Sequence, residues 1–193
     1  MRICVYAGSN PGEDPAYREA ARALGETLAA RGIGLVYGGG RTGLMGAVAD
    51  GCRGAGGHVT GIIPGFLEQK EIAHHDISDL RVVGSMHERK TLMAELSDGF
   101  IALPGGIGTF EELFEIWTWS QLGQHRKPCG LLNVAGFYDR LVAFLDGVVA
   151  EGFLKDDHRR TLLVDTDAGA LLDAFGTYEP PTGGGKWLEL ETT

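Results

Sequence analysis

The stretch Gly99-Phe100-Ile101-Ala102-Leu103-Pro104-Gly105-Gly106-Ile107-Gly108-Thr109-Phe110-Glu111-Glu112 contains the parts that decide the fold. Its first residues are small or apolar and predict a short buried strand, and an amphipathic helical pattern follows as far as Leu122. A proline and three glycines separate the two. At such a junction the first backbone N–H groups of the helix have no partner, and the helix dipole is positive there. The stretch therefore predicts an anion site, most often used for phosphate.

Glu112 has two interpretations. The segment Thr109-Phe110-Glu111-Glu112 has the spacing of a capping box, in which Glu112 would only satisfy a backbone N–H group. Alternatively, Glu112 lies in the first helical turn beside the bound ligand and reacts with it. The residues of this stretch alone leave both interpretations open.

Composition excludes several classes of function. The net charge of −9 argues against nucleic-acid binding through a broad basic surface, so local donors must capture any anionic ligand. Cys4, Cys52 and Cys129 are far apart and lack the spacing of a zinc or redox pair, which predicts reduced thiols in the core of a cytoplasmic protein. We recognise no signal peptide and no membrane-spanning segment, and so expect no membrane partner.

Short apolar segments alternate with helical patterns along the chain. This predicts an α/β fold with three layers: a Rossmann-like, mostly parallel sheet with helices on both faces. The predicted strands are 2–6, 34–37, 58–63, 80–83, 99–103, 128–132 and 162–165. The predicted helices are 15–31, 44–53, 86–96, 110–122, 137–151 and 168–175, while part of 66–79 is a short helix or a lid. We expect one domain over residues 1–175 and a mobile tail over 176–193, with a possible docking contact by Trp187.

A second glycine loop, Gly38-Gly39-Gly40-Arg41-Thr42-Gly43, follows the predicted strand 34–37. Its glycine spacing matches a dinucleotide fingerprint, but no acidic residue lies about 20 residues further on to hold a ribose diol. A single phosphate is therefore the better ligand hypothesis. The alternative is a glycine turn needed only for close packing of helix against strand. In a parallel sheet both glycine loops lie at the carboxyl edge, where two loops can hold one ligand.

The helix predicted from Met86 places Arg89 within an apolar stripe of Met86, Met93 and Leu96. A guanidinium on a buried face requires an anionic partner. That partner is either a substrate or a structural carboxylate, such as Asp98 or a neighbouring glutamate. The adjacent Lys90 is the best candidate for a Schiff-base lysine, but its context favours ion pairing.

Two further patterns receive non-catalytic interpretations. His74-His75-Asp76 could ligate a metal, but no second cluster supports it, so a solvated loop is the preferred interpretation and no metal is expected. Trp117 and Trp119 are predicted to lie in the core and at an interface. Together with Ile116, Trp119 flanks the inward-facing Trp117, which favours at least a homodimer.

These motifs resemble a known family. Met86-His87-x-Arg89-Lys90, followed by Pro104-Gly105-Gly106-x-Gly108-Thr109-x-x-Glu112, resembles the Lonely Guy family of cytokinin riboside 5′-monophosphate phosphoribohydrolases, long mislabelled as lysine decarboxylases. The likeness extends to about residue 175. It includes, among others, Gly43-Leu44-Met45-Gly46 and Thr118-Trp119-Ser120-Gln121-Leu122-Gly123.

The resemblance implies hydrolysis of the N-glycosidic bond of adenosine-type 5′-monophosphates, N6-substituted ones included, to free base and ribose 5-phosphate by a homodimer. The family's catalytic residues correspond to Arg89 and Glu112. Its ligand contacts correspond to Arg89 with Glu71, Lys90, Gly106, Ile107, Gly108 and Thr109. The expected substrate-binding set is completed by Ser9, Gly39, Gly40, Gly43, Met45, Met86 and Gly105.

Two positions depart from the common family pattern: Asn10 replaces a second serine, and Ile107 replaces a frequent tyrosine. Both concern substrate preference more than the reaction. The chemistry is consistent with the residues, because N-glycoside cleavage builds positive charge on the ribose and needs a carboxylate and an activated water near C1′. No metal or organic cofactor is required. The alternatives are a non-catalytic nucleotide or molybdenum-cofactor carrier using the same phosphate site, and an NAD-binding module, which the missing ribose carboxylate disfavours.

Overall fold

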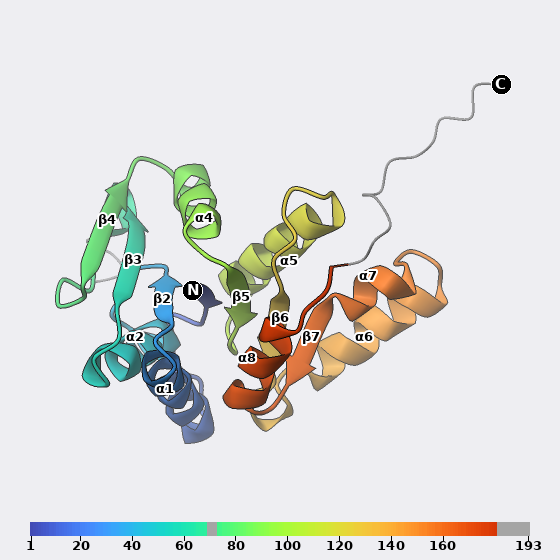
Figure 1. Ribbon diagram of the computed structural model, residues 1–193, viewed down its shortest axis with the longest axis horizontal. Helices are drawn as coiled ribbons and strands as arrows, with labels where there is room; N and C mark the ends of the chain where they lie inside the picture. Colours follow the sequence, from blue (N-terminus) through green and yellow to red (C-terminus); the bar gives the residue numbers. More distant parts are fainter. Residues whose placement is uncertain (69–72, 181–193) are drawn as a thin grey trace.

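The computed structural model describes residues 1–68 and 73–180. Within these residues, seven parallel strands form one sheet in the order β4-β3-β2-β1-β5-β6-β7 (Figure 1). The strands are β1 (Arg2–Tyr6), β2 (Gly34–Tyr37), β3 (Val59–Pro64), β4 (Asp79–Val83), β5 (Gly99–Ala102), β6 (Cys129–Leu132) and β7 (Leu162–Asp165). The helices are α1 (Pro15–Ala30), α2 (Gly43–Gly54), α3 (Gly65–Glu68), α4 (Met86–Glu95), α5 (Ile107–Gln121), α6 (Asp139–Ala150), α7 (Asp156–Arg160) and α8 (Ala168–Gly176), with a 3-10 turn η1 (Val134–Gly136).

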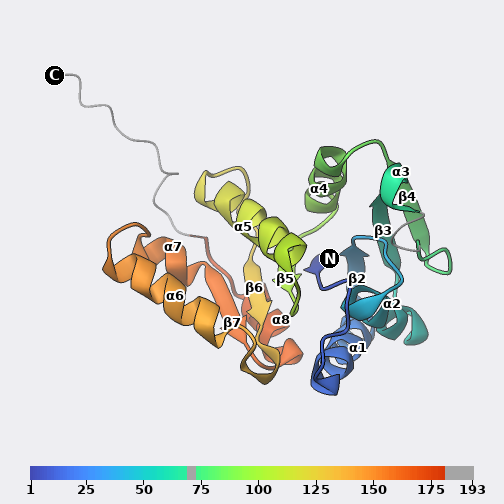
Figure 2. The ribbon, with the colours of Figure 1, turned by 180° about the vertical axis from the view of Figure 1, so that it is seen from behind.

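Helices cover both faces of the sheet (Figures 1 and 2). One core cluster joins alternate β1 residues to α1, α2 and α8, and a second joins the remaining β1 residues to α4, α5 and α6. Side chains of a strand alternate between its faces, so β1 contributes Ile3 and Val5 to the first cluster and Cys4 and Tyr6 to the second. The predicted three-layer, Rossmann-like fold is confirmed.

Local capping explains where the first and fourth helices begin. The Asp14 carboxylate accepts a hydrogen bond from the backbone N–H of Ala16, and Pro15 occupies the first helical position, as the sequence predicts. At α4, Ser85 Oγ accepts a bond from the N–H of Glu88, whose carboxylate accepts one from Gly84. Both caps hold their helices at a defined position relative to the preceding loop.

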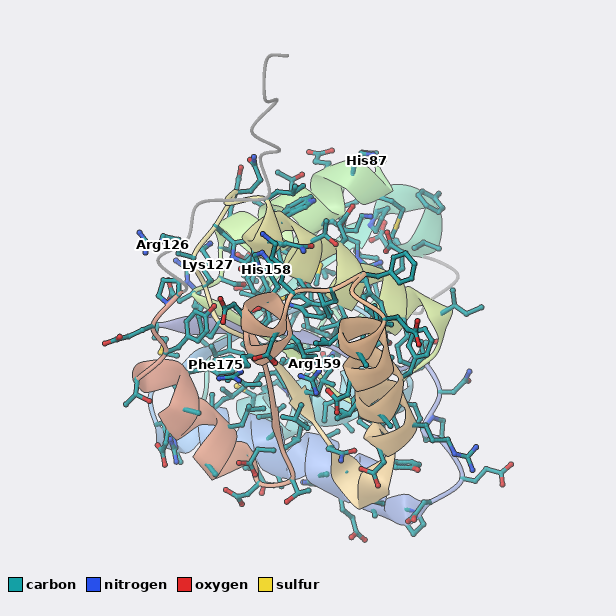
Figure 3. All side chains as sticks on the ribbon, turned by 90° about the vertical axis from the view of Figure 1, so that its right-hand side faces the viewer. His87, Arg126, Lys127, His158, Arg159 and Phe175 are labelled. Carbon is teal, nitrogen blue, oxygen red and sulfur yellow. The ribbon has the colours of Figure 1, made fainter. Side chains whose placement is uncertain are left out.

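Several glycines are required for close packing. A Cβ at Gly25 of α1 would overlap the Val48 carbonyl of α2, and a Cβ at Gly51 would overlap the Arg22 carbonyl. On the same face, the ring of Phe175 on α8 (Figure 3) would lie 2.9 Å from a Cβ at Gly99 and 3.0 Å from one at Gly130. Part of the high glycine content therefore serves helix packing rather than ligand binding.

Some expectations differ from the structure. The short α7 was not predicted, because five residues are too few to show a helical period. Ile116, predicted at an interface, is only 3% exposed in the chain's own core, whereas Trp119 is half-buried. The three cysteines are buried free thiols, as predicted, and burial raises the pKa of Cys129 to about 12. Trp187 and most of the expected tail lie outside the described residues.

No helix in the part of the chain that the structure describes has the length and apolar character needed to cross a membrane.

Candidate functional site

Three loops meet at the carboxyl edge of the sheet, following β1, β2 and β5. The chain runs outward from β1 to β4 and then returns to β5 on the other side of β1, so the edge beside β1 and β5 is a topological switch point. The N–H of Gly8 donates to the Pro104 carbonyl at 3.1 Å, and the Gly8 carbonyl accepts from the N–H of Leu44 at 2.9 Å. The β1 loop thus joins the two glycine loops, which lie at one edge as predicted.

The glycine loop after β2 and the start of α2 pack closely against the β1 loop. Gly39 and Gly43 have φ values of +77° and +60°, which glycine adopts readily, and a Cβ at Gly43 would overlap the backbone of Ser9. The N–H groups of Leu44 and Met45, at the start of α2, both donate to the Gly8 carbonyl. These contacts support the packing interpretation of this loop, and ligand contacts by its residues remain predictions.

The start of α5 differs from that of α2. The helix begins at Ile107 with Gly106 as N-cap and no side-chain cap, so Thr109 is already the third helical residue. The capping-box interpretation of Thr109 and Glu112 is therefore wrong, because it needs Thr109 at the N-cap position. Space is open around Gly106 and Gly108, and Ile107 is 88% exposed. The N-terminal turn of α5 faces open space, as an anion site requires.

A cavity of about 190 Å³ lies next to this turn. Its walls are the β1 loop from Gly8 to Gly12 and the Pro104–Gly106 segment, with Tyr17, Leu44 and Phe137 at its sides. The Tyr17 and Phe137 rings meet edge to face with centroids 5.9 Å apart. The predicted contact Ser9 lines this cavity together with Asn10, so the cavity offers polar side chains beside the α5 N-terminus.

Arg89 of α4 and Glu112 of α5 form a second cluster beside the glycine loop after β2. Arg89 Nη2 is 4.0 Å from Glu112 Oε1, and the two side chains are 6% and 12% exposed. The guanidinium also donates from Nε to the Ile62 carbonyl at 3.1 Å and from Nη2 to the Gly38 carbonyl at 3.2 Å. The predicted burial of Arg89 is confirmed. Its carboxylate neighbour is Glu112; Asp98 instead accepts from the N–H of Arg2.

Two buried β1 side chains, Cys4 and Tyr6, are close enough to Glu112 for its charge to affect them, and no sequence pattern pointed to them. Burial raises the pKa of the Cys4 thiol, and the negative charge of Glu112 raises it further. Burial, the neighbouring Cys4 and Glu112 likewise raise the pKa of Tyr6. Both side chains therefore stay neutral beside the carboxylate. Their spacing in β1 gave no signal, because Cys4 and Tyr6 read as ordinary alternate core positions.

Lys90 joins α4 to α5 next to this pair. Its Nζ donates to Glu111 Oε1 at 2.6 Å and to Glu115 Oε1 at 2.9 Å. Although burial lowers the pKa of Lys90, the two carboxylates raise it on balance above its ordinary value. The predicted ion pairing is confirmed, and a charged, paired lysine is a poor Schiff-base nucleophile. Lys90 as a substrate contact remains a prediction.

The remaining predicted residues are placed as follows. Met45 is 7% exposed, and its sulfur would lie 3.3 Å from a Cβ at Gly38, close to the guanidinium. Met86 Sδ is 3.7 Å from Arg89 Nη1.

Glu71 lies outside the described residues. His87, within the α4 motif, is exposed at the outer end of the molecule (Figure 3). Among residues 1–68 and 73–180, no group of three potential metal ligands is found.

The fold and the site together define a Rossmann-like α/β protein with an open glycine loop and a buried arginine–glutamate pair at the switch point. Comparison with known proteins extends this description. The family model described as "Possible lysine decarboxylase" matches residues 45–175. A cytokinin riboside 5′-monophosphate phosphoribohydrolase of Arabidopsis thaliana is 50% identical over 93% of this chain and 82% of its own. One of Oryza sativa subsp. japonica is 50% identical over 93% of this chain and 74% of its own.

The chain therefore belongs to the family of cytokinin riboside 5′-monophosphate phosphoribohydrolases. A solved structure of the molybdenum cofactor carrier protein from Chlamydomonas reinhardtii shares the fold, with a TM-score of 0.69 and 22% sequence identity. The match covers 91% of this chain and 96% of the carrier protein's chain.

Proposed function

We propose that the protein hydrolyses the N-glycosidic bond of adenosine-type nucleoside 5′-monophosphates, N6-substituted ones included, to the free base and ribose 5-phosphate. The observation that carries this proposal is the buried Arg89–Glu112 pair, whose glutamate lies on the same helix as the open N-terminal turn of α5. A ribose 5-phosphate likewise has a reacting carbon, C1′, and a phosphate at its two ends. Relatives at 50% identity bear the name of this activity.

Glu112 performs the chemistry in this proposal. As the C1′–N bond breaks, positive charge develops on the ribose, and the Glu112 carboxylate stabilises it. A water molecule then adds to C1′ and Glu112 accepts its proton, while the departing base takes up a proton from solvent. Glu112 returns its proton to solvent afterwards, so the reaction consumes one water. Arg89 keeps Glu112 ionised and oriented, since a guanidinium beside a carboxylate favours its charged form. Arg89 and Glu112 are thus the proposed catalytic residues.

The phosphate is held at the start of α5. The backbone N–H groups of Gly106, Ile107, Gly108 and Thr109 are the first-turn donors that an α-helix leaves without an internal partner. Ser9 lines the adjacent cavity and supplies a hydroxyl from the β1 loop. Backbone donors of this kind bind a phosphate far better than a neutral 5′-hydroxyl. The monophosphate, rather than the nucleoside, is therefore the expected substrate.

The test is direct. Purified protein is incubated with AMP, with isopentenyladenosine monophosphate and with the two matching nucleosides, and free base and ribose 5-phosphate are separated by chromatography. We expect base release from the monophosphates only. Comparable turnover of adenosine and AMP would contradict the phosphate site, and tight binding without any turnover would instead support the carrier alternative.

We further propose that the protein acts as a homodimer in the cytoplasm. Ile107 is exposed, and Phe110, Phe114 and Trp119 of α5 stay half-buried although they pack against the second core cluster, so a second copy would cover the surface that they still expose. Buried free thiols are compatible with a reducing compartment. Sedimentation at micromolar concentration tests the dimer, and a monomer there would contradict it.

A further inference from the structure

His74 is buried, although the sequence favoured a solvated loop for it. Its exposure is 1%, and both ring nitrogens have neighbours: Nδ1 lies 3.2 Å from the Tyr37 hydroxyl and Nε2 lies 3.5 Å from Asp50 Oδ1. The adjacent His75 is exposed. Burial lowers the pKa of His74, while the nearby Asp50 opposes this. His74 therefore connects Tyr37 of β2 to Asp50 of α2, and the expectation of a solvated loop is wrong for this residue.

The hydrogen bonds of the ring follow from the chemistry of its neighbours. The Asp50 carboxylate, 3.5 Å from Nε2, favours the tautomer with its proton on Nε2, and Nδ1 then accepts from the Tyr37 hydroxyl. Tyr37 itself is fully buried, and burial raises its pKa, so the hydroxyl keeps its proton. The ring is fixed on two sides by groups that belong to different elements.

The backbone at His74 is fastened to the β2 glycine loop. The N–H of His74 donates to the Gly39 carbonyl at 3.0 Å, and Ala73 forms an isolated antiparallel bridge with Gly40. The carbonyl of Gly38, which precedes Gly39 in the same loop, accepts from Arg89 Nη2 at 3.2 Å. The ring thus anchors a backbone segment whose N–H holds the glycine loop, and this loop in turn contacts the guanidinium beside Glu112.

We propose that His74 is a positioning residue for the reaction: it holds the Gly38–Gly40 backbone, whose carbonyl in turn fixes the Arg89 guanidinium against Glu112. The inference rests on the proposed function for its catalytic consequence. A glycine-rich loop has little stiffness of its own, because glycine has the widest choice of backbone conformations. Its geometry must therefore come from groups outside it, and His74 with Tyr37 and Asp50 provides them.

The first experiment measures steady-state hydrolysis of AMP by the full chain and by its His74→Ala variant. We expect kcat to fall about tenfold to a hundredfold, because small misplacements of catalytic groups have effects of this size. KM should change less than about twofold, since the phosphate is held at α5. His75→Ala, one residue away and exposed, is the matched control and should retain wild-type values. A folded His74→Ala protein with wild-type kcat would overturn the proposal.

A second variant covers the case in which His74→Ala does not fold. Tyr37→Phe removes a single oxygen atom and should lower kcat in the same direction by a smaller factor. The effect is then measured again in an Arg89→Lys background. A residue that acts through Arg89 loses most of its effect once that guanidinium is absent, whereas a residue with only a structural role lowers activity by the same factor in both backgrounds. The latter result would contradict the inference.

A spectroscopic readout separates this inference from the proposed function. The Nε–H signal of buried Arg89 in a nitrogen–proton NMR spectrum is assigned by its loss in Arg89→Lys. We expect it to shift or broaden in His74→Ala or Tyr37→Phe and to stay unchanged in His75→Ala. If AMP is not hydrolysed but the signal responds, the function fails and the positioning role stands. If AMP is hydrolysed and the signal does not respond, the positioning role fails.

Discussion

The helices α2 and α5 begin in sequences of the same kind, a short buried strand followed by a glycine loop, yet their first turns differ. At α2 the N–H groups of Leu44 and Met45 donate to the Gly8 carbonyl, so the protein itself occupies these two donors. At α5, Gly106 and Gly108 face open space and Ile107 is exposed. The difference shows that a glycine loop before a helix predicts a set of donors without telling whether a ligand or another loop receives them.

The prediction with the largest expected effect tests whether α5 carries the catalytic carboxylate. Glu112→Gln keeps the size of the side chain and removes its charge, so it should lower kcat about 10²- to 10⁴-fold. AMP should still bind, because the proposed phosphate donors are backbone groups. Steady-state kinetics and equilibrium binding of AMP measure the two effects, and thermal unfolding shows that the variant is folded. Near-normal turnover would remove Glu112 from the mechanism.

The prediction with the next largest effect tests whether the first turn of α2 serves packing rather than ligand binding. A Cβ at Gly46 would overlap the Arg41 carbonyl, so Gly46→Ala should lower the free energy of unfolding by about 1–3 kcal/mol. Denaturant titration measures this loss. In the fraction that remains folded, KM for AMP should stay near the wild-type value, because packing is the role assigned to this turn. A stable variant with a raised KM would show that this turn binds the substrate instead of serving packing.

A matched substitution at α5 should have the opposite sign. Among the described residues, no atom beyond its neighbours and its own helix backbone lies within 4 Å of a Cβ at Gly108. Gly108 is inside the helix, so Gly108→Ala should raise the free energy of unfolding by about 0.5–1 kcal/mol. The added methyl group lies where the phosphate is proposed to approach, so KM for AMP should rise. An unchanged KM would argue against a phosphate at this turn.

The smallest effect concerns the far end of α5. His125 Nε2 donates to the Ile116 carbonyl at 2.8 Å, and Nδ1 accepts from the N–H of Lys127 at 3.1 Å, so the ring is bound in its neutral form. Burial lowers its pKa below 6.5, only partly opposed by the Ile116 carbonyl. The unfolded chain therefore binds the extra proton first, and stability falls as the pH drops below 6.5.

Denaturant titrations at pH 7.5 and pH 5.5 measure this contribution, which is at most about 1.4 kcal/mol for each unit by which the pKa is lowered. Buried His74 contributes with the same sign. The loss between the two pH values should be smaller in His125→Gln, and an equal loss in both proteins would exclude His125 as its source. Acid sensitivity would then not arise at this end of α5.

Much of the fold was predictable because its signals are local. Each strand is a short apolar run, the start of α1 is marked by Asp14 and Pro15, and the alternation of strands with helices implies parallel pairing. The inward orientation of Arg89 also followed from helical spacing alone, since Met93 shares its face. Local patterns determine such features because they depend only on near neighbours in the chain.

Other features depend on partners far away in the sequence, and only the tertiary structure decided them. Glu112 is the carboxylate beside Arg89 because α4 and α5 pack on the same face of the sheet, whereas the sequence named Asp98 or a neighbouring glutamate as the structural partner. The burial of His74 required Tyr37 and Asp50 from two other elements.

The sequence by itself determined the order of strands and helices, the parallel sheet, the family and the residue types at the carboxyl edge. The tertiary structure decided which helix start is open, which carboxylate meets the arginine and which histidine is internal. The physical reason is the same in each case. Hydrogen-bond donors and buried charges take the partner that the packing brings to them, and that partner lies tens of residues away along the chain.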